Sequence, residues 1–150
     1  MDETFTAYPE TKQFHKFCKD YLKSPAELRR LEFYGTIKIH GSNISIVFTS
    51  LNTWRIQSRN RILSAKDDLY DCFVTLNQLP LEKLAQEILC IHGNSTASDW
   101  KDIMVVGERA GKRIQKGVGV SQVDRFLTIF NIRIGHEWQD IRKFRYVSIY

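Results

Sequence analysis

Segments in which apolar and polar residues alternate with a period of two constrain the fold of this chain more than any other feature. The alternation is clear in residues 44–48, resumes at 54–58 after the turn signal Asn52-Thr53, and returns in residues 126–134. Residues 33–38 contain β-branched and aromatic side chains and also predict a strand. Because successive side chains of a strand point to opposite faces, this pattern is typical of a sheet with one buried face. The short breaks favour antiparallel pairing of neighbouring strands.

Apolar residues at helical spacing occupy the stretches between these strands. They predict one helix over Thr11–Leu22 and a second, shorter helix over Pro25–Leu31. Between Ala65 and Trp100, apolar residues again recur at helical intervals from Leu76 to Leu89, with Pro80 near the start. We interpret this apolar helical face as part of the core.

Ile103–Val106 is a short apolar run that predicts a buried strand closed by Gly107. Together with the other segments it predicts an α+β fold with an antiparallel sheet, in one domain that spans residues 1–150. The last residues, Arg145–Tyr150, read like the middle of a strand, whereas most domains end in polar, loosely held residues. We therefore expect a domain that is incomplete at its C-terminus.

Composition narrows the class of protein. No apolar run approaches the roughly 20 residues that a membrane-spanning helix needs, and the acidic start Met1-Asp2-Glu3 is unlike a secretory signal. The three cysteines are odd in number and widely spaced, which argues against a disulfide framework and predicts a reduced, intracellular compartment, cytoplasmic by default. The net charge of +5 favours polyanionic partners only weakly.

Lys38 stands at the end of the predicted strand 33–38, directly before a His-Gly turn. A lysine attacks a phosphorus atom when burial or neighbouring positive charge keeps its amine deprotonated. The strand end would hold Lys38 rigidly, and Gly41 would let a phosphate approach the backbone closely. An exposed strand lysine before an ordinary turn is the alternative, and so short a pattern does not decide between them by itself.

Charged groups also follow two other predicted strands. Arg59 and Arg61 come after the strand at 54–58, and a guanidinium group at a strand end is well placed for bidentate contact with phosphate. Glu108 comes just after the strand at 103–106 and could accept hydrogen bonds from ribose hydroxyls, although a surface ion pair is the alternative.

Four blocks of residues occur in the order found in RNA ligases. They are Lys-Ile-His-Gly-Ser-Asn at 38–43, Ser-Arg at 58–59, Gly-Glu-x-Ala-Gly-Lys-x-Ile-Gln-Lys-Gly-Val at 107–118 and Phe-x-x-x-Phe-x-Ile at 126–132. The chain therefore resembles RNA ligases of the phage and kinetoplastid RNA ligase 2 type, within the covalent nucleotidyltransferase superfamily. The resemblance spans about Phe33 to Trp138, and the block at 107–118 is its most specific element.

The resemblance implies the antiparallel β-sheet fold of nucleotidyltransferases, an ATP-grasp-like ligase fold, of which this chain would be the N-terminal portion. It also implies that Lys38 attacks the α-phosphate of ATP, releases pyrophosphate and holds AMP as lysyl-AMP. The AMP then passes to a 5′-phosphate on RNA, and a 3′-hydroxyl displaces it to seal the ends. ATP, Mg²⁺ or Mn²⁺, and RNA with these two ends are the implied cofactors and partners.

Matching positions imply roles for individual residues. Glu108 matches the ribose-binding glutamate of the family, and Phe130 matches the aromatic residue that stacks on adenine. Arg59 matches an arginine that contacts the nucleotide, and Asn43 matches the polar residue after the turn of the nucleophile. His40, beside the nucleophile, would orient the loop or the phosphates.

Other matches are weaker. Arg61, Lys112, Gln115 and Lys116 would contact RNA or phosphate in a supporting role only. Relatives often have glutamate where this chain has Ile37, so any contact with adenine there must use the backbone. Asn131 stands where aspartate is common.

Two blocks of the family are missing from this sequence, a Glu-Gly-x-Val block and a closing Lys-x-Lys block. In the family these blocks supply the metal-binding glutamate and the lysines that bind the α-phosphate. We therefore identify no metal-ligating residue and expect this stretch alone to be a poor ligase. The alternatives are a truncated, catalytically inactive module that binds nucleotide or RNA, and another nucleotidyltransferase such as a DNA ligase or a capping guanylyltransferase.

Overall fold

The computed structural model describes residues 4–10, 12–22, 26, 32, 37–93 and 102–144. The chain divides into two compact units, which we describe separately. One unit is Tyr8–Lys38, and the other joins Met1–Ala7 to Ile39–Tyr150. No helix in the described part of the chain is both long and apolar enough to cross a membrane.

The unit Tyr8–Lys38 contains α1 (Phe14–Tyr21), which confirms the helix predicted over residues 11–22. The Lys12 ammonium donates a hydrogen bond of 2.8 Å to the Asp20 carboxylate, and this bond raises the pKa of Lys12 above its ordinary value. Of the helix predicted at 25–31, the structure describes Ala26 alone, and this residue is helical. Residues 33–36 of the predicted strand lie outside the described residues, and Ile37 and Lys38 are not in a strand.

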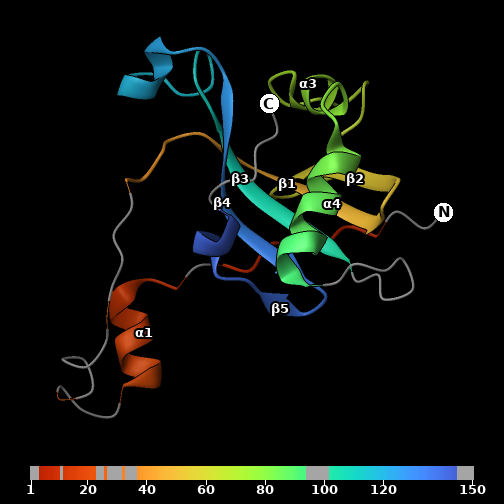
Figure 1. Cartoon of the computed structure of the whole chain (residues 1–150). Helices are drawn as coiled ribbons and strands as arrows, with labels where there is room; N and C mark the ends of the chain where they lie inside the picture. Colours follow the sequence, from red (N-terminus) through yellow and green to blue (C-terminus); the bar gives the residue numbers. More distant parts are fainter. Residues whose placement is uncertain are drawn as a thin grey trace. The chain divides into compact units, whose positions relative to one another are not determined.

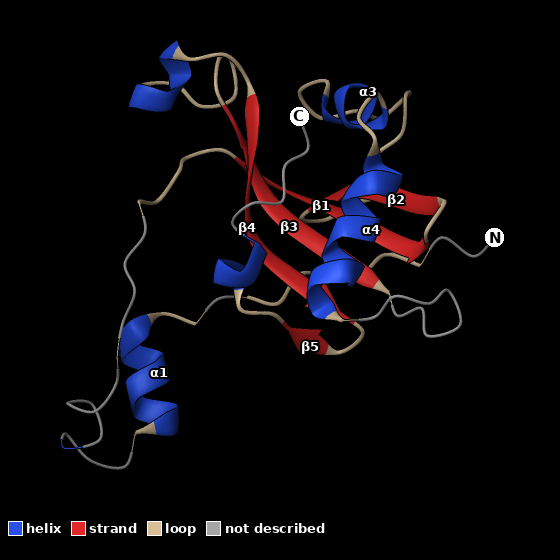
Figure 2. Cartoon of the chain, in the orientation of Figure 1, coloured by secondary structure: helices blue, strands red, loops and turns tan. Residues whose placement is uncertain are grey.

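The second unit is built on an open antiparallel sheet of five strands in the order β2-β1-β3-β4-β5 (Figure 2). The strands are β1 (Ser42–Ser50), β2 (Thr53–Ser58), β3 (Ile103–Ala110), β4 (Phe126–Ile134) and β5 (Glu137–Trp138). With the three α-helices of the described residues, the sheet confirms the predicted α+β class. The alternating segments 44–48, 54–58 and 126–134 all lie in strands, as predicted.

The strand predicted at 103–106 is longer than the sequence indicated. Gly107 does not close it, because β3 continues to Ala110 and therefore includes Glu108. The reason is a close approach of β4: a Cβ atom on Gly107 would lie 2.5 Å from the carbonyl oxygen of Thr128. The glycine thus serves strand pairing at this position, where isolated glycines otherwise weaken strands.

The helical stretch predicted between residues 65 and 100 forms two helices, α3 (Cys72–Asn77) and α4 (Leu81–His92). Pro80 separates them, because proline lacks the amide hydrogen needed to continue a helix and clashes with the preceding turn. Gly93 ends α4 in the left-handed conformation, with φ of 86°, which is the usual role of glycine after a helix.

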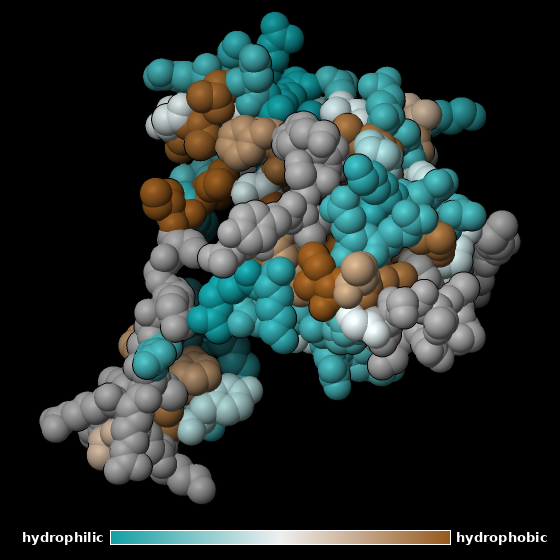
Figure 3. Space-filling view, in the orientation of Figure 1, coloured by the Kyte–Doolittle hydropathy of each residue, from teal (hydrophilic) through white to brown (hydrophobic). Residues whose placement is uncertain are grey.

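The core lies between one face of the sheet and the helices α3 and α4 (Figure 1). Helix α4 contributes the buried residues Leu81, Leu84, Ala85 and Ile88, and its outward side is mostly hydrophilic (Figure 3). Phe48 of β1 is fully buried in this cluster. Burial also raises the pKa of the Cys72 thiol to about 12, so this thiol stays protonated at neutral pH.

The opposite face of the sheet, called the polar face below, carries polar side chains beside the buried apolar side chains of Val47, Met104 and Val106. The register places Arg55 beside Val47, and Gln57 beside Ser45, on the side away from the helices. Thr6 covers part of this face: its amide donates to Gln57 Oε1 at 3.4 Å, and its carbonyl accepts from Gln57 Nε2. Arg55 Nη2 donates to Thr6 Oγ1 at 2.7 Å. The N-terminal segment is therefore tied to β2 by side chains.

Candidate functional site

The register of the sheet brings three of the residues at one end of the sheet into a row. Asn43 of β1 pairs with Glu108 of β3, and Glu108 pairs with Thr128 of β4. Directly paired residues of neighbouring antiparallel strands point to the same face, here the face away from the helices. Arg59 follows β2 at the same end, because Ser58 is the last residue of β2 and pairs with Ile44. Each of the four sequence blocks thus contributes to this end.

Gly41 is held on both sides of its backbone by residues that are distant in sequence. Its amide donates a hydrogen bond of 3.0 Å to Glu108 Oε1. Its carbonyl accepts a hydrogen bond of 3.3 Å from Gln115 Nε2. Hydrogen bonds to charged groups are stronger than neutral ones, so the Glu108 carboxylate contributes most to fixing the chain as it enters β1.

Only glycine fits at position 41. A Cβ atom there would lie 2.2 Å from the carbonyl oxygen of Arg109 and 2.9 Å from its carbonyl carbon. These are backbone atoms of β3, which cannot move aside without disturbing the sheet. The sequence predicts that Gly41 lets a phosphate approach, whereas in the structure it lets two backbones approach closely.

Phe130 occupies a β-bulge in β4. Val106 pairs with Asn131 and the next residue, Gly107, pairs with Ile129, so Phe130 is an extra residue without an opposite partner in the ladder. Bulges redirect side chains and occur near functional sites. The Phe130 side chain is 39% exposed, and it lies two residues along β4 from Thr128, which faces Glu108.

Lys38 belongs to the unit Tyr8–Lys38, whereas the other matched residues from His40 onward belong to the sheet unit. The register that joins Glu108 to Asn43 therefore does not extend to Lys38. Lys38 and His40 are exposed, and Ile37 is 92% exposed. Of the two conditions that we expect to activate Lys38, burial or neighbouring positive charge, burial is not met at this exposed position.

Buried polar atoms without a partner collect on the polar face. Within the described chain they are Asn43 Oδ1, Ser45 Oγ, Arg55 Nε and Arg133 Nε, and one further atom, Arg109 Nε, lies on the helix-covered side. An unpaired buried polar atom costs about 1–3 kcal/mol, so native proteins keep few of them. In the sequence, the only sign of these atoms on β1 between Ile44 and Ile46 is Ser45, which the alternating pattern predicts as an ordinary outward-facing strand residue.

The four residues that we assigned a supporting role with phosphate, together with Arg59 of the nucleotide site, fall into three groups by their contacts. Arg61 forms an ion pair with Asp67 at 2.8 Å, and Lys112 forms one with Asp124, also at 2.8 Å. The hydrogen bond from Lys112 holds the pKa of Asp124 below its ordinary value. Arg59 and Lys116 are exposed, and their side chains make no hydrogen bond or ion pair within the described residues. Gln115 binds Gly41.

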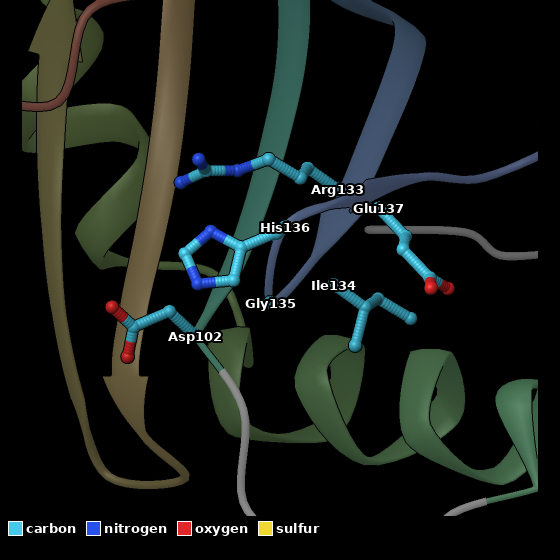
Figure 4. A pocket seen from close by; sticks show the side chains of 6 residues that line it. All are labelled: Asp102, Arg133, Ile134, Gly135, His136 and Glu137. Atoms are coloured by element: carbon cyan, nitrogen blue, oxygen red, sulfur yellow. The ribbon is translucent and has the colours of Figure 1, made fainter.

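A cavity of about 410 Å³ lies at the other end of β3 and β4. Its lining residues are Asp102, Arg133, Ile134, Gly135, His136 and Glu137. Figure 4 shows Arg133, His136 and Asp102 on one side of the turn between β4 and β5, with Glu137 on the other. No residue of the four sequence blocks lines this cavity, so it is separate from the candidate site.

The described residues contain no cluster of three or more His, Cys, Asp or Glu side chains that could hold a metal ion. Comparison of the sequence with known protein families and with curated proteins finds no match.

Proposed function

We propose that this chain carries the nucleotide site of an ATP-dependent RNA ligase, with a nucleotidyltransferase fold and with Lys38 as the nucleophile. One observation carries the proposal: Gly41 and Asn43 of the first sequence block meet residues of the other three blocks at one end of a single sheet. The hydrogen bond from Gly41 to Glu108 joins the first and third blocks directly. Pairing of Glu108 with Thr128 brings in the fourth.

In the proposed reaction, the uncharged Lys38 amine attacks the α-phosphorus of ATP. A nitrogen–phosphorus bond forms, the bond from the α-phosphorus to the bridging oxygen breaks, and pyrophosphate leaves with the electron pair of that bond. The nitrogen loses its remaining extra proton to solvent. A 5′-phosphate of RNA then displaces the lysine and takes the AMP, and a 3′-hydroxyl displaces AMP as the ends are joined.

The residues at the end of the sheet have chemistry that fits a nucleoside. One Glu108 oxygen binds Gly41, and a carboxylate has further acceptor sites for ribose hydroxyls. The buried Asn43 Oδ1 has no donor within the described chain and supplies another acceptor. Phe130, redirected by its bulge, offers a partly exposed ring for stacking on adenine. Arg59 offers phosphate a guanidinium group that has no partner among the described residues.

A divalent cation normally neutralises charge on the phosphates in reactions of this kind. The described residues do not fit a protein-bound ion, because they include no suitable cluster of ligands. We therefore assign Mg²⁺ or Mn²⁺ no protein ligand among the described residues.

Incubation of the protein with radiolabelled ATP and Mg²⁺, followed by denaturing electrophoresis, tests the proposal. We expect label on the wild-type protein and none on Lys38→Ala. Lys83→Ala is the matched control, since Lys83 is exposed on α4 and away from the four blocks. Parallel reactions with radiolabelled GTP test the capping guanylyltransferase alternative, which predicts label from GTP instead.

Glu108→Gln tests the nucleotide site itself. Glutamine keeps an acceptor for the Gly41 amide but removes the negative charge, so we expect labelling to slow roughly tenfold or more with little loss of stability. Wild-type protein that takes up no label but binds ATP would support the inactive binding module. Wild-type protein that neither binds nor reacts with nucleotide would exclude the proposal.

A further inference from the structure

The loop between β3 and β4 has an unusual backbone at an arginine. Gly111 and Gly117 have φ of 118° and 71°, and Arg113 between them has φ of 66°. Glycine adopts this left-handed region freely, but a residue with a Cβ atom pays free energy for it. Residues held in such conformations cluster at functional sites. Arg113 therefore occupies a position where glycine would be more stable.

The base of this loop is firmly held. Ile114 is buried beneath it, and the amide of Lys112 donates 2.9 Å to the carbonyl of Val123. Arg125, at the far end of the loop, donates a hydrogen bond of 3.1 Å to the carbonyl of Lys112 and one of 3.2 Å to the carbonyl of Tyr70. Gly111 is also packed tightly, because a Cβ atom there would lie 2.6 Å from Arg125 Cα. The left-handed conformation at Arg113 is thus fixed by its surroundings.

The exposed part of the loop presents unused hydrogen-bond donors. Arg113 and Lys116 are exposed, and their side chains make no hydrogen bond or ion pair within the described residues. Their backbone amides, and that of Gln115, also donate no hydrogen bond there. Lys112 differs, because Asp124 pairs with it. Backbone amides in turns that mix right- and left-handed residues form concave sites for anions.

The loop lies beside the entrance to β1, since Gln115 Nε2 donates to the carbonyl of Gly41. A group bound by Arg113 would therefore be close to the residues that follow Lys38 in sequence. The side-chain amide of Gln115 joins the loop to the start of β1, and the side chains of Arg113 and Lys116 take no part in this contact.

We propose that residues 111–117 form a phosphate-binding loop, in which Arg113 and neighbouring backbone amides hold a phosphate group next to Gly41. Which molecule carries this phosphate rests on the proposed function: the triphosphate of ATP and the 5′-phosphate of RNA are the two sources. The left-handed arginine is the residue that the loop retains for this contact at the expense of stability.

Arg113→Gly separates binding from stability. Glycine relieves the backbone cost, so the variant should unfold at the same or a higher denaturant concentration than wild type. Its dissociation constant for the phosphorylated ligand should rise roughly tenfold or more, because one bidentate, charge-assisted contact is lost. For RNA, the slope of log affinity against log salt should fall by about 1.

Three binding titrations by fluorescence anisotropy or calorimetry identify the source: ATP, a 5′-phosphorylated RNA oligonucleotide, and the same RNA with a 5′-hydroxyl. Weakening for ATP assigns the loop to the triphosphate, and weakening for phosphorylated RNA alone assigns it to the 5′-phosphate. Equal weakening for both RNAs assigns it to an internal phosphate. Lys83→Gln is the matched control and should bind like wild type, because Lys83 is exposed on α4, outside the loop and the four sequence blocks.

Arg113→Gln keeps the left-handed cost but removes the charge, so it should weaken binding as much as Arg113→Gly without the gain in stability. Unchanged affinity for all three ligands in both variants would overturn the inference. Wild-type protein that takes up no label while Arg113→Gly still weakens binding would remove the ligase proposal and leave the phosphate loop. Wild-type protein that takes up label, together with unchanged affinity of Arg113→Gly, would support the ligase proposal and remove the phosphate loop.

Discussion

The two faces of the sheet differ in how completely their polar groups are satisfied. On the face covered by α3 and α4, neighbouring strands present apolar side chains such as Ile46, Val105 and Ile132. On the other face, Asn43 and Ser45 bury polar atoms that have no partner within the described chain. The first face holds the main hydrophobic cluster, although Arg109 Nε has no partner there within the described residues. The second face buries Val47, Met104 and Val106 but retains more of the unpartnered polar atoms, whose cost makes sense if a ligand uses them.

The largest effect should come from the covered face. Phe48→Ala removes a fully buried ring from the core and should lower the free energy of unfolding by about 3–5 kcal/mol. Urea denaturation followed by circular dichroism measures this change. Val74→Ala, at a 46% exposed position of α3, should change it by less than about 0.5 kcal/mol. Similar losses in the two variants would mean that the covered face is not the core.

The sequence indicated the covered face well, because alternation and helical spacing are local signals. It failed where pairing between distant segments decided the structure. Gly107 was read as a strand end, but the approach of Thr128 makes it part of β3. The sequence predicts one helical stretch with Pro80 near its start, whereas the structure has a separate helix on each side of Pro80.

For the candidate site, the sequence supplied residue types but no geometry. The hydrogen bonds from Gly41 to Glu108 and from Gln115 to Gly41 span 67 and 74 residues of sequence, which no local pattern can reveal. Nor could a pattern show that Lys112 pairs with Asp124 while Arg113 has a left-handed backbone and no partner in the described part of the chain. Resemblance identified Glu108, and only the fold shows that its carboxylate also fixes the start of β1.

A second, smaller effect should come from the junction between Gly41 and β3. Gly41→Ala places a methyl group against the Arg109 backbone, so we expect a loss of about 1–3 kcal/mol in unfolding free energy. Labelling by ATP should fall as well, since the chain after Lys38 must shift. Gly119→Ala is the control, because no atom lies within 4 Å of a Cβ atom there. Normal stability and labelling in Gly41→Ala would contradict the close approach of these two backbones.

The polar face should respond more weakly when its N-terminal cover is altered. Thr6→Ala removes the acceptor for Arg55 Nη2 and should cost about 0.5–1.5 kcal/mol, the usual net contribution of a hydrogen bond. Thr4→Ala, at an exposed position of the same segment, should have no measurable effect. If both variants are as stable as wild type, the segment does not hold β2 in solution.

The smallest change in stability among the sheet variants, opposite in sign to those of Phe48, Gly41 and Thr6, concerns Ser45. Its hydroxyl is buried without a partner in the described chain, so Ser45→Ala removes an unsatisfied group and should raise the unfolding free energy by zero to about 1 kcal/mol. A loss of more than about 1 kcal/mol would show that the hydroxyl has a partner in solution.

Thermal denaturation with saturating ATP adds a second test. If the polar face binds nucleotide through this hydroxyl, ATP should stabilise wild type more than Ser45→Ala. Equal stabilisation would show that the Ser45 hydroxyl takes no part in binding and would leave Asn43 and Glu108 as the nucleotide-binding residues of this face.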